Sequence, residues 1–207
     1  MSTRPMARDA FLFLIPLFAA TVTALWLGWM TITVILTGLV LFVAFFFRDP
    51  QRAISTDPSI IVSPADGRVV SIEREGDTNR VSIFLSIFNV HVNRSPVAGE
   101  VVDVRYHRGR FRAAFSHLAS VENEKNTLTI AGDGVTVVCS QIAGLIARRI
   151  VCWKDAGHRV EKGERFGLIR FGSRVDLTLP QDVTIAVRVG DRVRGGSSTI
   201  GTFKVLP

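Results

Sequence analysis

The chain has 207 residues, which is enough for one membrane-associated element and one compact domain but too few for a second large domain. Its formal net charge is +7, from 25 lysines and arginines against 18 acidic residues, and this suits an anionic membrane surface or nucleic acid. Because no helix-turn-helix pattern, zinc-ligand spacing or aromatic RNA-binding motif accompanies the charge, we expect no nucleic-acid partner. The two cysteines, Cys139 and Cys152, stand in apolar runs, so we expect buried reduced thiols and neither a disulfide nor a metal site.

Residues 10–47 form an uncharged segment that belongs in lipid. At 38 residues it is too long for one membrane-spanning helix and just long enough for two short ones. Gly28 and the neighbouring Trp26 and Trp29 lie at its midpoint, where glycine permits a reversal and tryptophan prefers the headgroup region. The segment therefore predicts a two-helix hairpin, and we assign residues 1–47 to an N-terminal membrane anchor.

Arginines flank both outer ends of this segment, at Arg4, Arg8, Arg48 and Arg52. Since the cytoplasmic flanks of membrane helices carry excess positive charge, we expect both ends, and the domain that follows, on the cytoplasmic side of the cell's inner membrane. Two alternatives stay open. A secretory signal peptide could end at Val22-Thr23-Ala24, although the apolar run continues past that point. A shallow re-entrant hairpin would not cross the bilayer but would leave the domain on the same side.

A domain of different composition follows over residues 48–207, because proline and alternating charge around Asp49-Pro50 end any helix. Short runs rich in valine and isoleucine alternate with turn signals such as Asp66-Gly67 and Gly195-Gly196. We therefore predict a mainly β (β-rich α+β) domain, a sandwich or a barrel-like arrangement, with a helical patch at 112–121. The expected strands are 60–62, 69–72, 81–87, 101–106, 128–130, 135–140, 146–152 and 183–189.

The dipeptide Gly172-Ser173 has the chemistry to break its own peptide bond. A serine hydroxyl can attack the carbonyl carbon of the residue before it, and a preceding glycine leaves that carbonyl open and the backbone free to adopt unusual geometry. Taken alone, the pair is also a common turn dipeptide. The remainder of the chain has to decide between these interpretations.

Two further residues are candidates for acid–base chemistry. Asp66 stands in a turn between two expected strands, where it either forms the turn or orients a histidine. His91 interrupts a strand-like run and is the candidate base, whereas the other three histidines stand in charged or loop-like contexts. A lone histidine is also compatible with a structural or exposed role.

A polar cluster at Asn123 and Glu124 follows an apolar patch that contains Phe111, Phe115 and Leu118. The cluster fits the solvated end of a helix. It also fits the mouth of a lipid-binding site, where apolar side chains meet acyl chains and the two polar residues bind a headgroup.

Five motifs occur in order along the chain: Phe47-Arg48-Asp49-Pro50, Ser63-Pro64-Ala65-Asp66-Gly67, His91-Val92-Asn93-Arg94-Ser95-Pro96, Asn123-Glu124-Lys125 and Phe171-Gly172-Ser173-Arg174-Val175-Asp176. This ordered set resembles the phosphatidylserine decarboxylases, in their short membrane-associated form. The likeness covers nearly the whole chain, and the set is far more specific than any one motif. Members of this family process themselves and make a pyruvoyl prosthetic group from an internal serine.

The resemblance implies that the chain cuts itself between 172 and 173 into a larger N-terminal and a small C-terminal product, which stay together as a heterodimer. Ser173 would be the nucleophile and the source of the covalent pyruvoyl group, His91 the base and Asp66 its orienting acid. The pyruvoyl carbonyl would form a Schiff base with phosphatidylserine, lose carbon dioxide and release phosphatidylethanolamine.

Two departures from the larger members of the family concern the site. Those members commonly have Leu-Gly-Ser-Thr at the cleavage position, whereas this chain has phenylalanine before Gly172 and arginine after Ser173. They also carry a second histidine where Arg94 stands here. Either His91 covers both roles, or Arg94 assists by binding the phosphate or carboxylate of the substrate together with Asn123 and Glu124.

Three alternatives to the decarboxylase remain. The first is a membrane-tethered serine hydrolase that uses Ser173, His91 and Asp66 on an external substrate. The second is a non-catalytic lipid-binding module. The third follows from the tail, 189–201, which resembles the hairpin of lipoyl-like carrier domains but has no equivalent modifiable lysine.

Overall fold

The structure, a computed structural model, describes residues 6–109, 123–144, 149–170 and 172–204. The chain divides into two compact units, Met1–Gln51 and Arg52–Pro207. The expected helical patch at 112–121 and the apolar patch with Phe111, Phe115 and Leu118 lie outside the described residues.

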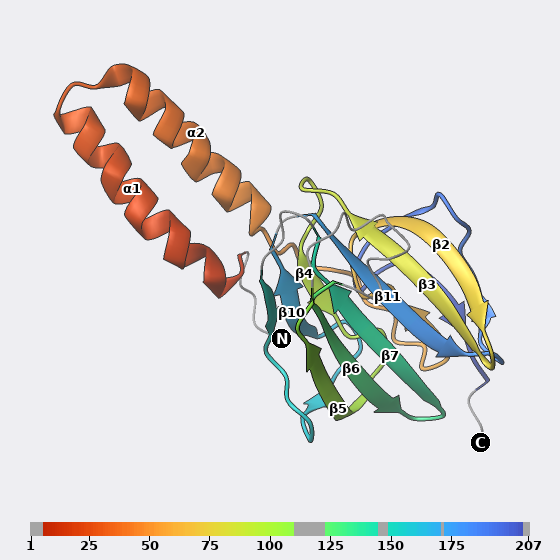
Figure 1. Ribbon diagram of the computed structural model, residues 1–207. Helices are drawn as coiled ribbons and strands as arrows, with labels where there is room; N and C mark the ends of the chain where they lie inside the picture. The colour runs from red at the N-terminus through yellow and green to blue at the C-terminus, as the bar shows by residue number, and fades with distance from the viewer. Residues whose placement is uncertain (1–5, 110–122, 145–148, 171, 205–207) are drawn as a thin grey trace. The chain divides into compact units, whose positions relative to one another are not determined.

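The first unit is a helical hairpin, as the sequence predicts. A 3-10 turn, η1 (Arg8–Ala10), leads into α1 (Phe11–Trp26), and α2 (Met30–Phe46) returns beside it (Figure 1). The reversal falls at Gly28, whose φ of 74° is disfavoured for residues with a Cβ. The open end is closed by the amide of Ala7, which donates to the Phe47 carbonyl at 3.0 Å.

The hairpin exposes apolar side chains along both helices, and Trp26 at its tip is 84% exposed. By length and composition, the segment Arg8–Trp26, with 19 residues, could cross a membrane, and it is the one such helix in the described part of the chain. The second helix, Met30–Phe46, is equally apolar but shorter. Such a surface is unfavourable in water, so it requires an apolar covering.

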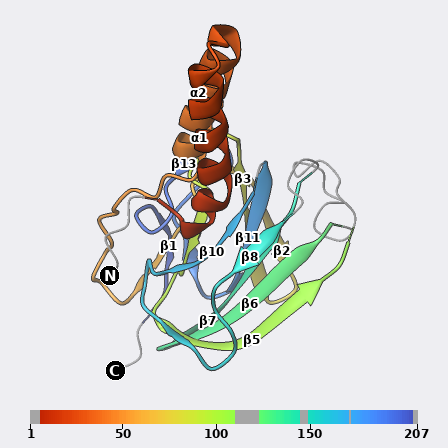
Figure 2. The ribbon, with the colours of Figure 1, turned by 90° about the vertical axis from the view of Figure 1, so that its left-hand side faces the viewer.

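The second unit is built on antiparallel sheets and confirms the prediction of a mainly β domain. An eight-stranded sheet has the order β13-β2-β3-β11-β7-β6-β5-β9, and its strands twist and curl (Figures 1 and 2). Two three-stranded sheets, β4-β10-β8 and β1-β14-β12, complete the unit. The strands are β1 (Ile60–Val62), β2 (Gly67–Glu75), β3 (Thr78–Leu85), β4 (Val92–Arg94), β5 (Gly99–His107), β6 (Lys125–Gly132), β7 (Val135–Ile142), β8 (Ile150–Cys152), β9 (Arg159–Val160), β10 (Arg165–Ile169), β11 (Ser173–Pro180), β12 (Thr184–Ile185), β13 (Arg192–Val193) and β14 (Thr199–Thr202).

Strand β11 lies in the middle of the large sheet, between β3 and β7. Its residues alternate in the manner of a strand: Val175, Leu177 and Leu179 are fully buried in the core, and the residues between them face the other side. The sequence did not reveal this strand, because Arg174 and Asp176 interrupt the apolar pattern. Both charged side chains are nevertheless buried, since they bind each other.

Two predicted strands are too long, and of a third, 146–152, the structure has Ile150–Cys152 as a strand while residues 146–148 lie outside the described part of the chain. The run 81–87 leaves the sheet after Leu85, because the Asn89 carboxamide accepts hydrogen bonds from the amide and hydroxyl of Ser86 at 2.9 and 2.8 Å and closes a turn. In 183–189 only Thr184 and Ile185 pair, so apolar composition alone overestimated this strand.

The tail does not form a hairpin. Strand β13 pairs with β2 in the large sheet, whereas β14 pairs with β1 and β12 in a different sheet. The turn at Gly195-Gly196 therefore carries the chain from one sheet to another. This arrangement differs from the strand-turn-strand hairpin on which the carrier-domain alternative depends.

Candidate active site

The scissile dipeptide lies where the chain passes from β10 into β11. Gly172 has φ of 39°, and no heavy atom lies within 4 Å of the position that a Cβ would take there. Ser173, the first residue of β11, is fully buried and pairs with Leu85 of β3. Within the described part of the chain, the Ser173 hydroxyl makes no hydrogen bond. A buried hydroxyl thus follows a residue in the left-handed region whose surroundings are open.

His91 is brought close to this junction by backbone pairing. It is 2% exposed and directly precedes β4, and its carbonyl accepts a hydrogen bond from the amide of Ile169 at 3.3 Å. Ile169 lies four residues before Ser173, and Leu85, the pairing partner of Ser173, lies six residues before His91. The chain segments that lead to Ser173 and to His91 are therefore held side by side by backbone hydrogen bonds.

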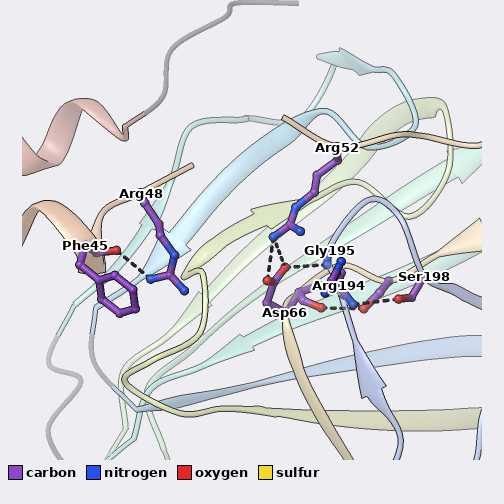
Figure 3. Close-up of polar contacts among 9 residues, drawn as sticks. Phe45, Arg48, Arg52, Asp66, Arg194, Gly195 and Ser198 are labelled. Carbon is purple, nitrogen blue, oxygen red and sulfur yellow. Dashed lines mark hydrogen bonds and ion pairs between the residues drawn. The ribbon is translucent and has the colours of Figure 1, made fainter. Parts of the chain in front are cut away.

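Asp66 lies in the turn between β1 and β2 and is nearly buried. Nη2 of Arg52 donates to its two carboxylate oxygens at 3.0 and 2.7 Å, and the amide of Gly195 donates to Oδ1 at 2.8 Å (Figure 3). In the described part of the structure, these are the hydrogen bonds of the carboxylate. Asp66 thus joins the β1–β2 turn to the Gly195 turn, and orientation of His91 by Asp66 stays a prediction.

Arg94 is also buried, at 3% exposure. Its Nη1 donates to the Gly163 carbonyl at 3.0 Å, and its amide donates to the Pro64 carbonyl at 2.9 Å. A Cβ at Gly196 would stand 2.9 Å from Cδ of Arg94, so the glycine makes room for the arginine stem. The side chain therefore packs against the turns at Gly163 and Gly196, and its role in binding substrate stays a prediction.

Asn123 and Glu124 differ in their surroundings. Asn123 is fully buried, and its Nδ2 donates to the Ala143 carbonyl at 2.7 Å. Glu124 is half-buried, and its carbonyl accepts from the amide of Ala143 at 2.9 Å. Burial, together with a hydrogen bond to the Glu124 carboxylate and its charge, raises the pKa of Tyr106. Asn123 therefore fixes the backbone, and Glu124 lies nearer to solvent.

The register of the large sheet places these residues at one end of it. Lys125 of β6, Ile142 of β7, Arg174 of β11 and Phe84 of β3 pair in one row across four strands. Asn123 and Glu124 come just before this row, as does Ser173, and the loop that leads to His91 comes just after it. The predicted nucleophile and polar cluster thus lie at one sheet end, and the loop that leads to the predicted base, His91, begins there.

Two arrangements were not anticipated from sequence. One is the ion pair between Arg52 and Asp66. The other is a buried chain of side-chain amides in which Gln141 Nε2 donates to Asn93 Oδ1 at 2.8 Å and Asn126 Nδ2 donates to Gln141 Oε1 at 3.1 Å. A signal for the second was present, since Gln141 directly follows the expected strand 135–140, and a glutamine that is buried at the end of an apolar strand needs polar partners.

Comparison with known proteins gives consistent matches. The family described as phosphatidylserine decarboxylase matches residues 39–201. A phosphatidylserine decarboxylase proenzyme of Solibacter usitatus is 48% identical, over 91% of this chain and 92% of the relative. A proenzyme of the same name from Symbiobacterium thermophilum is also 48% identical, over 96% of each chain. A third, from Aromatoleum aromaticum, is 50% identical over 78% of each chain.

Proposed function

This chain belongs to the phosphatidylserine decarboxylase family, and we propose that it decarboxylates phosphatidylserine to phosphatidylethanolamine after cutting its own backbone between Gly172 and Ser173. The observation that carries the proposal is the buried Ser173 hydroxyl. It makes no hydrogen bond within the described residues, and it follows a glycine whose surroundings are open. A buried hydroxyl without a partner costs stability, which favours a functional reason for its retention.

Self-cleavage follows from these residues. Ser173 Oγ attacks the Gly172 carbonyl carbon, and His91 accepts the hydroxyl proton. The C–N bond then breaks, the nitrogen takes up a proton, and residue 172 is held to Ser173 by an ester. Loss of the Ser173 Cα proton expels residue 172 as a carboxylate and leaves dehydroalanine. Water replaces its nitrogen, with release of ammonia, and residue 173 becomes the pyruvoyl group.

Pairing of strands explains why the two products would stay together. Cleavage at the start of β11 leaves this strand between β3 and β7. Residues 173–207 also supply β13 to the large sheet and β14 to the sheet that contains β1. The small product therefore remains hydrogen-bonded to the large product at several places, which supports a heterodimer.

The residues around position 173 fit a pyruvoyl group, because the Ser173 side chain is enclosed at the end of the sheet and His91 is tied to the same junction. When present, the group supplies an electrophilic carbonyl that binds the lipid amine and draws electrons as carbon dioxide leaves. In this proposal His91 returns a proton to the carbon that lost the carboxylate. Arg94, Asn123 and Glu124 are proposed to bind the headgroup.

The hairpin supports a membrane location, which also suits a phospholipid substrate. Its exposed apolar helices would lie in the bilayer and hold the enzyme at the surface that contains its substrate. We propose that the catalytic domain, from residue 48 onward, faces the cytoplasm of the cell, because of the arginines that flank the apolar run.

Mass spectrometry of the purified chain, with a decarboxylation assay on phosphatidylserine vesicles, tests the proposal. We expect a product of residues 173–207, about one sixth of the 22.8 kDa chain, with a carbonyl at its new N-terminus. Ser173→Ala and His91→Ala should remain uncut, whereas His158→Ala, at an exposed histidine in a surface turn, should cut normally. An intact wild-type chain that hydrolyses esters would indicate a serine hydrolase. An intact chain that binds lipid without turnover would indicate a binding module.

A further inference from the structure

The buried amides of Asn93, Gln141 and Asn126 connect the small sheet to the large one. Asn93 belongs to β4, while Gln141 and Asn126 belong to β7 and β6 and pair directly with each other. All three side chains are at least 96% buried. Gln141 is the central member, since it donates to Asn93 Oδ1 and accepts from Asn126 Nδ2. The Asn93 carboxamide is therefore held by its oxygen.

Its nitrogen has a different environment. Among the residues that the structure describes, Asn93 Nδ2 has no hydrogen-bond partner, and the Ser173 hydroxyl is in the same condition. A buried amide donor that is left unpaired lowers stability. The molecule thus keeps a fixed and costly donor at this position.

The register places the glutamine that holds Asn93 close to the reacting bond. Gln141, which holds Asn93, lies directly opposite Val175 on the core side of β11, and Ser173 is two residues earlier on the same side. Asn93, the middle residue of β4, is likewise two residues after His91. A Cβ at Gly167 would stand 2.9 Å from Gln141 Nε2, so β10, which leads to the scissile bond, lies against the same glutamine.

We infer that Asn93 is a further catalytic residue of self-cleavage, whose Nδ2 donates a hydrogen bond to the Gly172 carbonyl oxygen as Ser173 attacks it. This inference rests on the proposed function. Negative charge develops on that oxygen when Oγ adds to the carbonyl carbon, and a donor that is already oriented stabilises the charge without reorganisation. Gln141 is then a positioning residue, because it fixes the rotation of the Asn93 amide.

The test follows cleavage of the full-length chain after a pulse of cell-free synthesis in the presence of phosphatidylcholine vesicles. Asn93→Leu removes the donor in a side chain of similar size and should slow cleavage on the order of 100-fold. Gln141→Leu keeps the Asn93 donor but removes the hydrogen bond that fixes the Asn93 amide, and should slow cleavage by a smaller factor. Ser140→Ala is the matched control, since it removes one side-chain hydrogen bond, to Thr127, from the opposite face of β7. It should cleave at the wild-type rate.

A second readout separates catalysis from folding. Hydroxylamine cuts the ester that forms in the first step, so it should release the 173–207 fragment from the wild type and not from Asn93→Leu. Asn93→Leu also removes the acceptor of Gln141 Nε2 and should therefore unfold at a somewhat lower temperature, so thermal unfolding has to show that the variant is folded at the assay temperature. Cleavage of Asn93→Leu within about threefold of the wild-type rate would overturn the inference. It would also be overturned if Ser140→Ala lost as much cleavage rate and as much thermal stability as Asn93→Leu. If Asn93→Leu does not fold, cleavage of Gln141→Leu at the wild-type rate would overturn the inference instead. Cutting of Ser173→Ala at the 172–173 bond would instead refute the proposed function itself.

Discussion

Arg52 binds both carboxylate oxygens of Asp66 through one nitrogen, Nη2, at 3.0 and 2.7 Å. The two side chains are only 11% and 13% exposed, so this ion pair is largely removed from water. It ties the segment before β1 to the turn after it, and the amide of Gly195 adds a third connection. Asp66, which the sequence predicts to orient His91, thus joins two turns in the structure.

Variants of this ion pair test the role of Asp66. Asp66→Asn and Arg52→Met each break the pair, and we expect each to lower the free energy of unfolding by about 3 kcal/mol, because a nearly buried charge loses its partner. If Asp66 also orients His91, Asp66→Asn should cut itself at least about 10-fold more slowly than Arg52→Met. Denaturant unfolding and the rate of fragment formation measure the two effects. Equal cleavage rates would limit Asp66 to holding the turns together.

A second prediction concerns the ion pair within β11. Arg174 Nε and Nη2 bind the two oxygens of Asp176 at 2.7 and 2.8 Å, and both side chains are about 95% buried. Removing one partner leaves the other charge buried, so Asp176→Asn should lower the free energy of unfolding by about 3 to 5 kcal/mol. Replacement of both residues by apolar residues of similar size should lower the free energy of unfolding much less.

Strand β5 offers the matched control for this pair. Arg105 and Asp103 have the same spacing on a strand and the same 2.7 Å contact, but the arginine is 81% exposed. Asp103→Asn should therefore change the free energy of unfolding by less than about 1 kcal/mol. Similar effects at the two sites, measured by denaturant unfolding, would show that burial does not decide the strength of the β11 pair.

A third prediction separates strain from chemistry at Gly172. An alanine there meets no neighbouring atom but has to adopt a φ of 39°, which costs about 1 to 2 kcal/mol, or it relaxes and moves the carbonyl. We expect Gly172→Ala to fold and to cut itself about 10-fold more slowly, since that energy corresponds to roughly tenfold in rate. Gly190→Ala is the control, because Gly190 also has a positive φ and open space but lies in the turn before β13. A cleavage rate for Gly172→Ala equal to that of Gly190→Ala would contradict the requirement for glycine.

A fourth prediction concerns the acid stability of the domain. Burial opposes ionisation of Glu164, but hydrogen bonds from Lys154 Nζ at 2.5 Å and from the Glu161 amide at 2.8 Å outweigh it and lower the pKa of Glu164. A carboxyl whose pKa is lower in the folded state stabilises the fold above its ordinary pKa of 4.5, and that contribution is lost as the pH falls through the folded value.

Measurement of unfolding between about pH 7 and pH 3 checks this sign. Glu164→Gln should be less stable than the wild type at neutral pH, and the difference should shrink in acid. Glu161→Gln, at an exposed position three residues away, should follow the wild-type curve. A Glu164→Gln deficit that is constant over the whole range would show that the carboxylate does not contribute through its charge.

The sequence predicted some elements well because their pattern is local. Residues 10–47 are uncharged with glycine at the midpoint, and the hairpin turns there, at Gly28. Strands with continuous apolar runs, such as β1 and β7, were located from composition. Strand β11 was missed because half of its residues are polar, and whether Arg174 and Asp176 are exposed or buried depends on the flanking strands β3 and β7, which are distant in sequence.

The sequence by itself determined the family, the apolar helical hairpin, the mainly β character of the domain and the order of the motifs around Gly172 and Ser173, because these depend on residue type and spacing. Only the tertiary structure decided which side chains meet. It joined Asp66 to Arg52 and to Gly195, which is 129 residues away, and it linked Asn93 to Gln141 across two sheets. The physical reason is that buried polar atoms have to find partners wherever the fold provides them, and the hydrogen-bonding capacity of a residue does not specify which partner that will be.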